Sequence, residues 1–143
     1  MATREPNRVI YWDASAILSV LFTDSHSESA RSVAHEEGVH LLSTLCFAEV
    51  CAVIARFQRE HILADVLVQA AFETLTEGPW RRLTSWPDWK ITRSLADKWP
   101  LRGADLWHLA TAKSLKSQLP ELYLLTYDGR LQRAVDGENL SGK

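Results

Sequence analysis

Four acidic residues occupy places in the sequence where a carboxylate could do chemistry: Asp13, Glu49, Asp105 and Asp128. Asp13 ends the β-branched and aromatic run 9–12, and Asp128 closely follows the apolar run 122–126. Both should lie beyond the carboxyl end of a strand, the edge of an α/β sheet where ligands bind. Asp105 falls in the first turn of a predicted helix, whose dipole favours an ionised carboxylate. Helix capping would explain any one aspartate, whereas three at comparable positions favour a shared function.

Glu49 is harder to explain by capping. It lies in the apolar stretch 45–54, which predicts a helix that is buried nearly all round. A buried glutamate needs a cation, a proton or a pocket open to water. The alternative is a glutamate that points outward at the edge of its helix.

Four carboxylates brought together would repel one another and raise each other's pKa values unless a positive charge lies between them. A hard divalent cation such as Mg²⁺ or Mn²⁺ would supply that charge, because it prefers oxygen ligands and keeps several waters. Such an ion can activate a water and stabilise charge on a phosphodiester. The chemistry that this set indicates is therefore metal-dependent hydrolysis, provided that the four side chains converge in the fold.

Strands that alternate with helices must position these residues. We expect strands at 9–12, 39–43, 81–84 and 122–126, and helices at 14–22, 25–37, 44–59, 61–76, from about 87 to before 100, 103–117 and 128–135. This alternation predicts an α/β fold, a three-layer α/β/α sandwich around a parallel sheet of four or five strands. The polar tail 136–140 gives no basis for a final strand.

Composition is that of one globular domain over residues 1–143, with 46% hydrophobic and 24% charged residues. The longest apolar run, 14–22, is far short of the roughly 20 residues that cross a bilayer. The amino terminus lacks the features of a secretion signal, so we expect a cytoplasmic protein. Cys46 and Cys51 are poorly spaced for a disulfide or a zinc site, and we expect buried structural thiols.

Charge is unevenly distributed along the chain. The net charge is −2, but residues 1–80 carry −6 and residues 81–143 carry +4. The basic part is either a solvated face or a rim that attracts a polyanion. Four tryptophans interleave with these basic residues: Trp80, Trp86, Trp89 and Trp99. They could pack in the core or at a partner interface, or they could stack on bases.

Several motifs, in this order and spacing, resemble the PIN-domain nucleases, and within them the VapC-type ribonuclease toxins of toxin–antitoxin pairs. They are Tyr11-Trp12-Asp13-Ala14-Ser15-Ala16, Ala48-Glu49-Val50, the stretch Arg102 to Ala112 with A-D-L-W-H-L-A-T-A, and Leu125-Thr126-Tyr127-Asp128. The resemblance covers nearly the whole chain. The third and fourth motifs together are its most specific part.

The resemblance implies RNA cleavage with Mg²⁺ or Mn²⁺, a homodimer, and a small cognate antitoxin that blocks the site. It implies that Asp13, Glu49, Asp105 and Asp128 form the acidic metal site, with Ser15 and Thr126 as supporting hydroxyls. Beside it, Arg102, Arg130 and Arg133 are candidates for RNA contacts. His108 follows Asp105 by three residues on the same helix face. We expect it to pack under the site, because hard ions prefer oxygen.

Two other functions fit part of the pattern. One is an inactive PIN-like module that binds RNA or a protein without cleaving anything. The other is a phosphatase in which the aspartate after the first strand is the nucleophile. The commonest phosphatase form needs a second aspartate two residues later, where this chain has Ser15.

Overall fold

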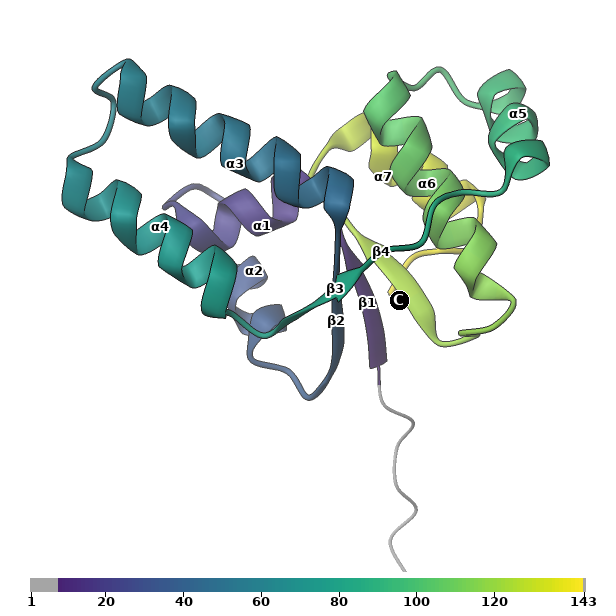
Figure 1. The fold of residues 1–143 in the computed structure, drawn as a ribbon. Helices are drawn as coiled ribbons and strands as arrows, with labels where there is room; N and C mark the ends of the chain where they lie inside the picture. The colour runs from purple at the N-terminus through teal and green to yellow at the C-terminus, as the bar shows by residue number, and fades with distance from the viewer. Residues whose placement is uncertain (1–7, 143) are drawn as a thin grey trace, which may run out of the picture.

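The computed structural model describes residues 8–142 as a parallel sheet with helices on both of its faces (Figure 1). The strands are β1 (Arg8–Trp12), β2 (Gly38–Ser43), β3 (Trp80–Leu83) and β4 (Leu122–Leu125). The helices are α1 (Ala14–Leu21), α2 (Ser27–Ala34), α3 (Thr44–Arg59), α4 (Asp65–Glu77), α5 (Trp89–Lys98), α6 (Gly103–Lys116) and α7 (Gly129–Gly137). The predicted fold class is confirmed, with four strands among the described residues.

The strand order is β3-β2-β1-β4, and every neighbouring pair is parallel. Tyr11 of β1 lies opposite Leu41 of β2 on one side and Leu124 of β4 on the other. With β1 in the centre and all strands parallel, their carboxyl ends meet at one edge. The loops that follow the strands, from both halves of the chain, therefore lie together at the carboxyl edge of the sheet.

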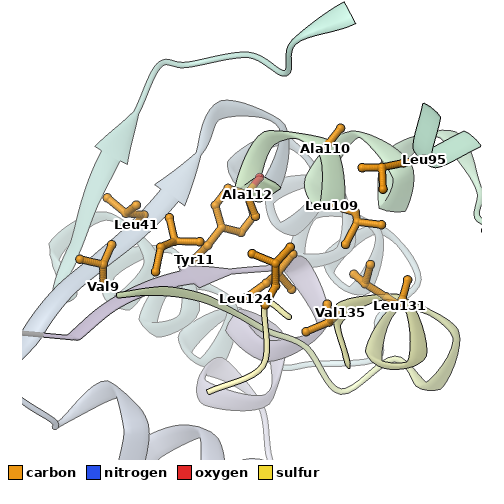
Figure 2. Close-up of a cluster of buried hydrophobic side chains, with 13 residues drawn as sticks. Val9, Tyr11, Leu41, Leu95, Leu109, Ala110, Ala112, Leu124, Leu131 and Val135 are labelled. Carbon is orange, nitrogen blue, oxygen red and sulfur yellow. The ribbon is translucent and has the colours of Figure 1, made fainter. Parts of the chain in front are cut away.

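Alternating side chains of β1 enter two separate cores. Val9 and Tyr11 pack in a core covered by α5, α6 and α7, part of which is drawn in Figure 2. Ile10 and Trp12 pack in the other core, under α1, α3 and α4. A strand buried on both faces is apolar at successive positions, as this one is.

The two edges of the sheet differ in how far other parts of the chain cover them. At one edge, β3 is only four residues long and exposes Arg81 and Arg82. At the other, the backbone N–H of Leu124 in β4 donates to the carbonyl of Leu140, at 2.8 Å. The side chain of Leu140 is fully buried, so the segment after α7 covers this edge. Within the described residues this segment contains no strand, a point on which no prediction was made from the sequence.

Two expectations about helices were wrong. The helix predicted from residue 61 begins at Asp65, because His61 adopts a left-handed backbone conformation (φ 53°) that interrupts the helical path. The stretch 45–54 forms α3 as predicted, but that helix is not buried all round: Phe47 is 38% exposed, and Ala48 and Ala52 are exposed as well. Among residues 8–142, no helix combines the length and apolar character of a membrane span.

Candidate active site

The candidate site lies where the parallel strands end, between the layer of α1 and α3 and the layer of α6 and α7 (Figure 1). Asp13 directly follows β1 and caps α1, and Asp128 caps α7 shortly after β4. Asp105 is in the first turn of α6. Glu49 is in α3, on the opposite layer from α6.

Asp13 is buried and held by hydrogen bonds to both carboxylate oxygens. Its Oδ1 accepts from the backbone N–H of Ala16 at 2.9 Å, as expected of a helix cap. The Ser15 hydroxyl donates to Oδ1 at 2.7 Å and lies 3.0 Å from Oδ2. The Thr126 hydroxyl donates to Oδ2. Asp13 therefore caps α1 while two hydroxyls hold its carboxylate in place.

Thr126 connects Asp13 to the loop that carries Asp128. While its hydroxyl donates to Asp13, its oxygen accepts from the backbone N–H of Asp128 at 3.0 Å. Ser15 makes a second link, because its oxygen accepts from the backbone N–H of Tyr127 at 2.9 Å. The two predicted supporting hydroxyls thus fasten the loop after β4 to the loop after β1.

Asp105 and Asp128 line one pocket of about 330 Å³ together with three arginines. The arginines are Arg102, Arg130 and Arg133, which are all exposed. Leu101 and Gly129 complete the lining. All three arginines that the sequence marked as candidates for RNA contacts therefore lie beside two of the four carboxylates.

Glu49 is connected to the other layer through His108. The Oε1 atom of Glu49 lies 2.6 Å from Nε2 of His108, and the Tyr11 hydroxyl lies 2.7 Å from Nδ1 of the same ring. His108 is 1% exposed, whereas the Glu49 side chain is 29% exposed. The Glu49 carboxylate is therefore stabilised by a hydrogen bond with a buried histidine and by partial contact with water.

The pKa directions reflect a crowded acidic site. Burial raises the pKa of Asp13, and the hydrogen bonds from Thr126, Ala16 and Ser15 offset only part of that effect. The pKa of Asp105 is raised by burial first and then by the negative charge of Asp128. Glu49 adds to this rise, and Arg102 opposes it. A cation placed among these groups would relieve the cost of ionising them.

The donor chemistry of the site fits a hard divalent cation, because its polar groups include carboxylates and hydroxyls that offer oxygen. The geometry is not yet that of a ligand cage: in the described part of the chain, no three acidic, histidine or cysteine side chains already stand close enough to hold one ion. Thr126 and Ser15 instead occupy the oxygens of Asp13. Rotation of carboxylate side chains would have to accompany metal binding.

The tryptophans divide into two groups. Trp80 packs edge-on against Trp12, and Trp99 donates to Glu138 beside the core, so these two are structural. Trp86 and Trp89 are 75% and 87% exposed. Together with Trp107 they line an apolar groove of about 580 Å³. Only this second group is available for stacking on bases or for contact with a partner.

The cysteines carry no sign of function. Cys46 is fully buried, and burial raises the pKa of its thiol well above its usual range. Cys51 is only half-buried, so the expectation of two buried thiols holds for Cys46 alone. Both are free, as the spacing predicted.

The contact between Tyr11 and His108 was not predicted from the sequence. Figure 2 shows the ring of Tyr11 extending from β1 toward α6, the helix of Ala112. A tyrosine at the centre of a buried strand needs a partner for its hydroxyl, and this requirement could have identified the residue. The identity of that partner, His108, depends on how α6 packs against the sheet.

The model of the PIN domain family matches residues 10–137. The chain belongs to the PIN domain family. Ribonuclease VapC45 and Ribonuclease VapC49, from two strains of Mycobacterium tuberculosis, are each 30% identical to it over 136 residues, which is 86% of this chain and 86% of each relative. The predicted resemblance is therefore confirmed.

A solved structure supports the fold independently. The crystal structure of Mycobacterium tuberculosis VapC20, a sarcin-ricin loop cleaving toxin, aligns with a TM-score of 0.61 and 14% sequence identity. The alignment covers 94% of this chain and 98% of that chain. At this identity, the likeness concerns the PIN architecture.

Proposed function

We propose that this PIN domain, spanning residues 1–143, is a Mg²⁺- or Mn²⁺-dependent endoribonuclease and the toxin of a toxin–antitoxin pair. Its family and its two VapC ribonuclease relatives support a nuclease toxin. The observation that carries the chemistry is that Asp105 of α6 and Asp128 line one pocket with three arginines, while Thr126 links the Asp13 carboxylate to the loop of Asp128. An anionic backbone and a metal-assisted hydrolysis both suit such a pocket.

Asp13, Asp105 and Asp128 would hold the ion, with Glu49 either completing the ligand set or orienting the attacking water. When bound, the ion would lower the pKa of water and offset charge on the phosphodiester. Thr126 and Ser15 hold the Asp13 carboxylate in place. Because Oε1 of Glu49 is engaged by His108, Oε2 is the oxygen left to accept a proton from water.

The arginines would bind RNA phosphates. Arg130 and Arg133 belong to α7, directly after Asp128, and Arg102 precedes Asp105 at the start of α6. Each can hold a phosphate oxygen by a charge-assisted hydrogen bond. Because each arginine is close in sequence to Asp128 or Asp105 and lines the same pocket, bound phosphates would lie near these two carboxylates.

The test is cleavage of a mixed RNA pool by the purified protein with Mg²⁺ or Mn²⁺, with a chelator as control. Asp13→Asn should abolish cleavage while the protein stays folded, as judged by circular dichroism. Asp88→Asn is a matched control, because Asp88 also caps a helix, α5, with its side chain. Full activity of Asp13→Asn, or equal activity in excess chelator, would refute the proposed mechanism.

The proposal includes a small protein antitoxin, a homodimer and a cytoplasmic location. Co-expression with the product of a neighbouring small open reading frame should yield a complex without RNase activity. Light scattering of the isolated protein should give the mass of a dimer. Neither an inactive binding module nor an aspartate phosphatase is favoured by a specific observation on this chain.

A further inference from the structure

We infer that His108 is a positioning residue: its buried ring, fixed by Tyr11, holds the Glu49 carboxylate in the orientation that the acidic site needs. This inference rests on the proposed function, because it assigns Glu49 to the same site as the three aspartates. It adds two residues, His108 and Tyr11, that touch neither the metal nor the RNA.

The direction of the hydrogen bond follows from the chemistry of its partners. An ionised carboxylate can only accept hydrogen bonds, so Nε2 of His108 donates to Oε1 of Glu49 across their 2.6 Å contact. This holds for either charge state of the ring. When the ring is neutral, Nδ1 is an acceptor, and the Tyr11 hydroxyl at 2.7 Å is its donor.

Tyr11 is suited to that task. Its side chain is fully buried in the centre of the sheet, and Figure 2 shows it reaching toward α6. Burial raises the pKa of the Tyr11 hydroxyl far above its usual range, so the hydroxyl keeps its proton and remains a donor. A buried tyrosine at this position fixes which ring nitrogen of His108 faces Glu49.

The His108 ring is also held by its neighbours. The ring of Tyr11 meets it nearly edge-on, with centroids 5.7 Å apart, and Trp107 does the same at 5.5 Å. Such contacts restrict rotation of a ring that is 1% exposed. Nε2 therefore presents a fixed donor at the boundary between the two helical layers.

Glu49 needs this help more than Asp13 does. Asp13 is short and receives hydrogen bonds from its own helix and from the next loop. Glu49 has a longer side chain, and the hydrogen bond found for its carboxylate within residues 8–142 is the one with His108. Groups that orient metal-site carboxylates typically change metal affinity or activity 10–100-fold when they are lost.

The experiment compares His108→Leu, which removes the donor, with His108→Gln, whose amide nitrogen can reach the position of Nε2. Affinity for Mn²⁺ alone is measured by calorimetry without RNA, and cleavage rates are measured separately. We expect about a 10-fold or greater loss of Mn²⁺ affinity and of kcat/KM for the leucine variant, and recovery of most of both by glutamine. Tyr11→Phe should produce an intermediate loss.

A double-mutant cycle separates positioning from simple packing. If His108 acts through Glu49, His108→Leu should cost no further Mn²⁺ affinity in a Glu49→Ala background. If the leucine variant does not fold, the same cycle is made with Tyr11→Phe, which should likewise cost no further Mn²⁺ affinity in the Glu49→Ala background. Undiminished Mn²⁺ affinity in folded His108→Leu, equal impairment of the glutamine and leucine variants, or additive losses in the cycle would overturn the inference.

Failure of the proposed function would give a different result. In that case the wild-type protein would show neither Mn²⁺ binding that depends on Asp13 nor RNA cleavage, whatever residue is at position 108. A wild-type protein that binds Mn²⁺ and cleaves RNA, beside His108 variants that do the same, would contradict only the role of His108.

Discussion

Thr126 is a small side chain that links the two loops carrying Asp13 and Asp128. Its hydroxyl donates to the buried carboxylate of Asp13, and its oxygen accepts from the backbone N–H of Asp128. Thr126 is 3% exposed, so water cannot easily replace either bond. Together with the link through Ser15, Thr126 therefore fixes the relative position of two proposed metal ligands from distant parts of the chain.

Thr126→Val is nearly isosteric and should lower the free energy of unfolding by about 1–3 kcal/mol, because it removes a buried hydroxyl that donates to Asp13 and accepts from the backbone N–H of Asp128. RNA cleavage should fall as well, since one of the two links between the loops of Asp13 and Asp128 is lost. Urea denaturation and a cleavage assay check the two effects. Thr92→Val is the control, because that hydroxyl only donates to the carbonyl of Asp88 within α5. Equal effects of the two substitutions would contradict this account.

At the scale of elements, the layer of α5, α6 and α7 is tied together by Glu138, which ends α7. Its carboxylate is 2.6 Å from Nζ of Lys98 and 3.3 Å from Nζ of Lys113, and it accepts from the indole N–H of Trp99 at 2.9 Å. Burial would raise the pKa of Glu138, but these three hydrogen-bonding partners outweigh it and hold the pKa below its ordinary value. This ion network stabilises the helices that carry Asp105 and the arginines.

Glu138→Gln should cost about 1–2 kcal/mol of stability at pH 7, because hydrogen bonds to a charge are lost but the lysines are partly screened by water. The folded pKa lies below the ordinary 4.5, so the ionised group stabilises the fold above about that pH. The difference in stability between the wild type and Glu138→Gln should shrink as the pH falls through the pKa of Glu138 in the folded protein. Melting curves between pH 7 and pH 3 measure it, with exposed Glu121→Gln as control. A difference independent of pH would contradict the assignment.

Local patterns made much of the fold predictable. The apolar run of β1 and the capping aspartates after β1 and β4 are local features, and the structure placed Asp13 and Asp128 as expected. The pairing of Glu49 with His108 was not predictable, because these residues are 59 positions apart and belong to helices on opposite faces of the sheet. The exposed side of α3 was missed for a related reason: apolar content does not reveal which face of a helix the neighbouring helices leave open.

At the scale of the whole molecule, charge is divided between the two halves of the chain. Residues 1–80 carry −6 and residues 81–143 carry +4, and the second half supplies the arginines of the pocket. The negative carboxylates and the positive rim therefore meet at the carboxyl edge of the sheet. Such an arrangement attracts a polyanion to the site that we propose binds a cation.

Binding of an oligoribonucleotide should therefore weaken with salt. In the Asp13→Asn background, which prevents cleavage, Arg130→Ala should raise Kd and reduce the slope of log K against log salt by about 0.7, the value for one phosphate contact on a single strand. Fluorescence anisotropy at several KCl concentrations measures both. Arg59→Ala, exposed at the end of α3, is the control. An unchanged slope for Arg130→Ala would remove this arginine from the RNA contacts.

The two borders of the sheet limit how copies of this chain can associate. The segment around Leu140 covers the outer side of β4, and the other border is short and carries Arg81 and Arg82. Both features discourage the addition of a further strand from outside. Self-assembly by this chain should accordingly bury helical surface and leave the number of hydrogen-bonded strands per subunit unchanged. The amide I infrared band should therefore not shift when the proposed dimer is diluted to monomer.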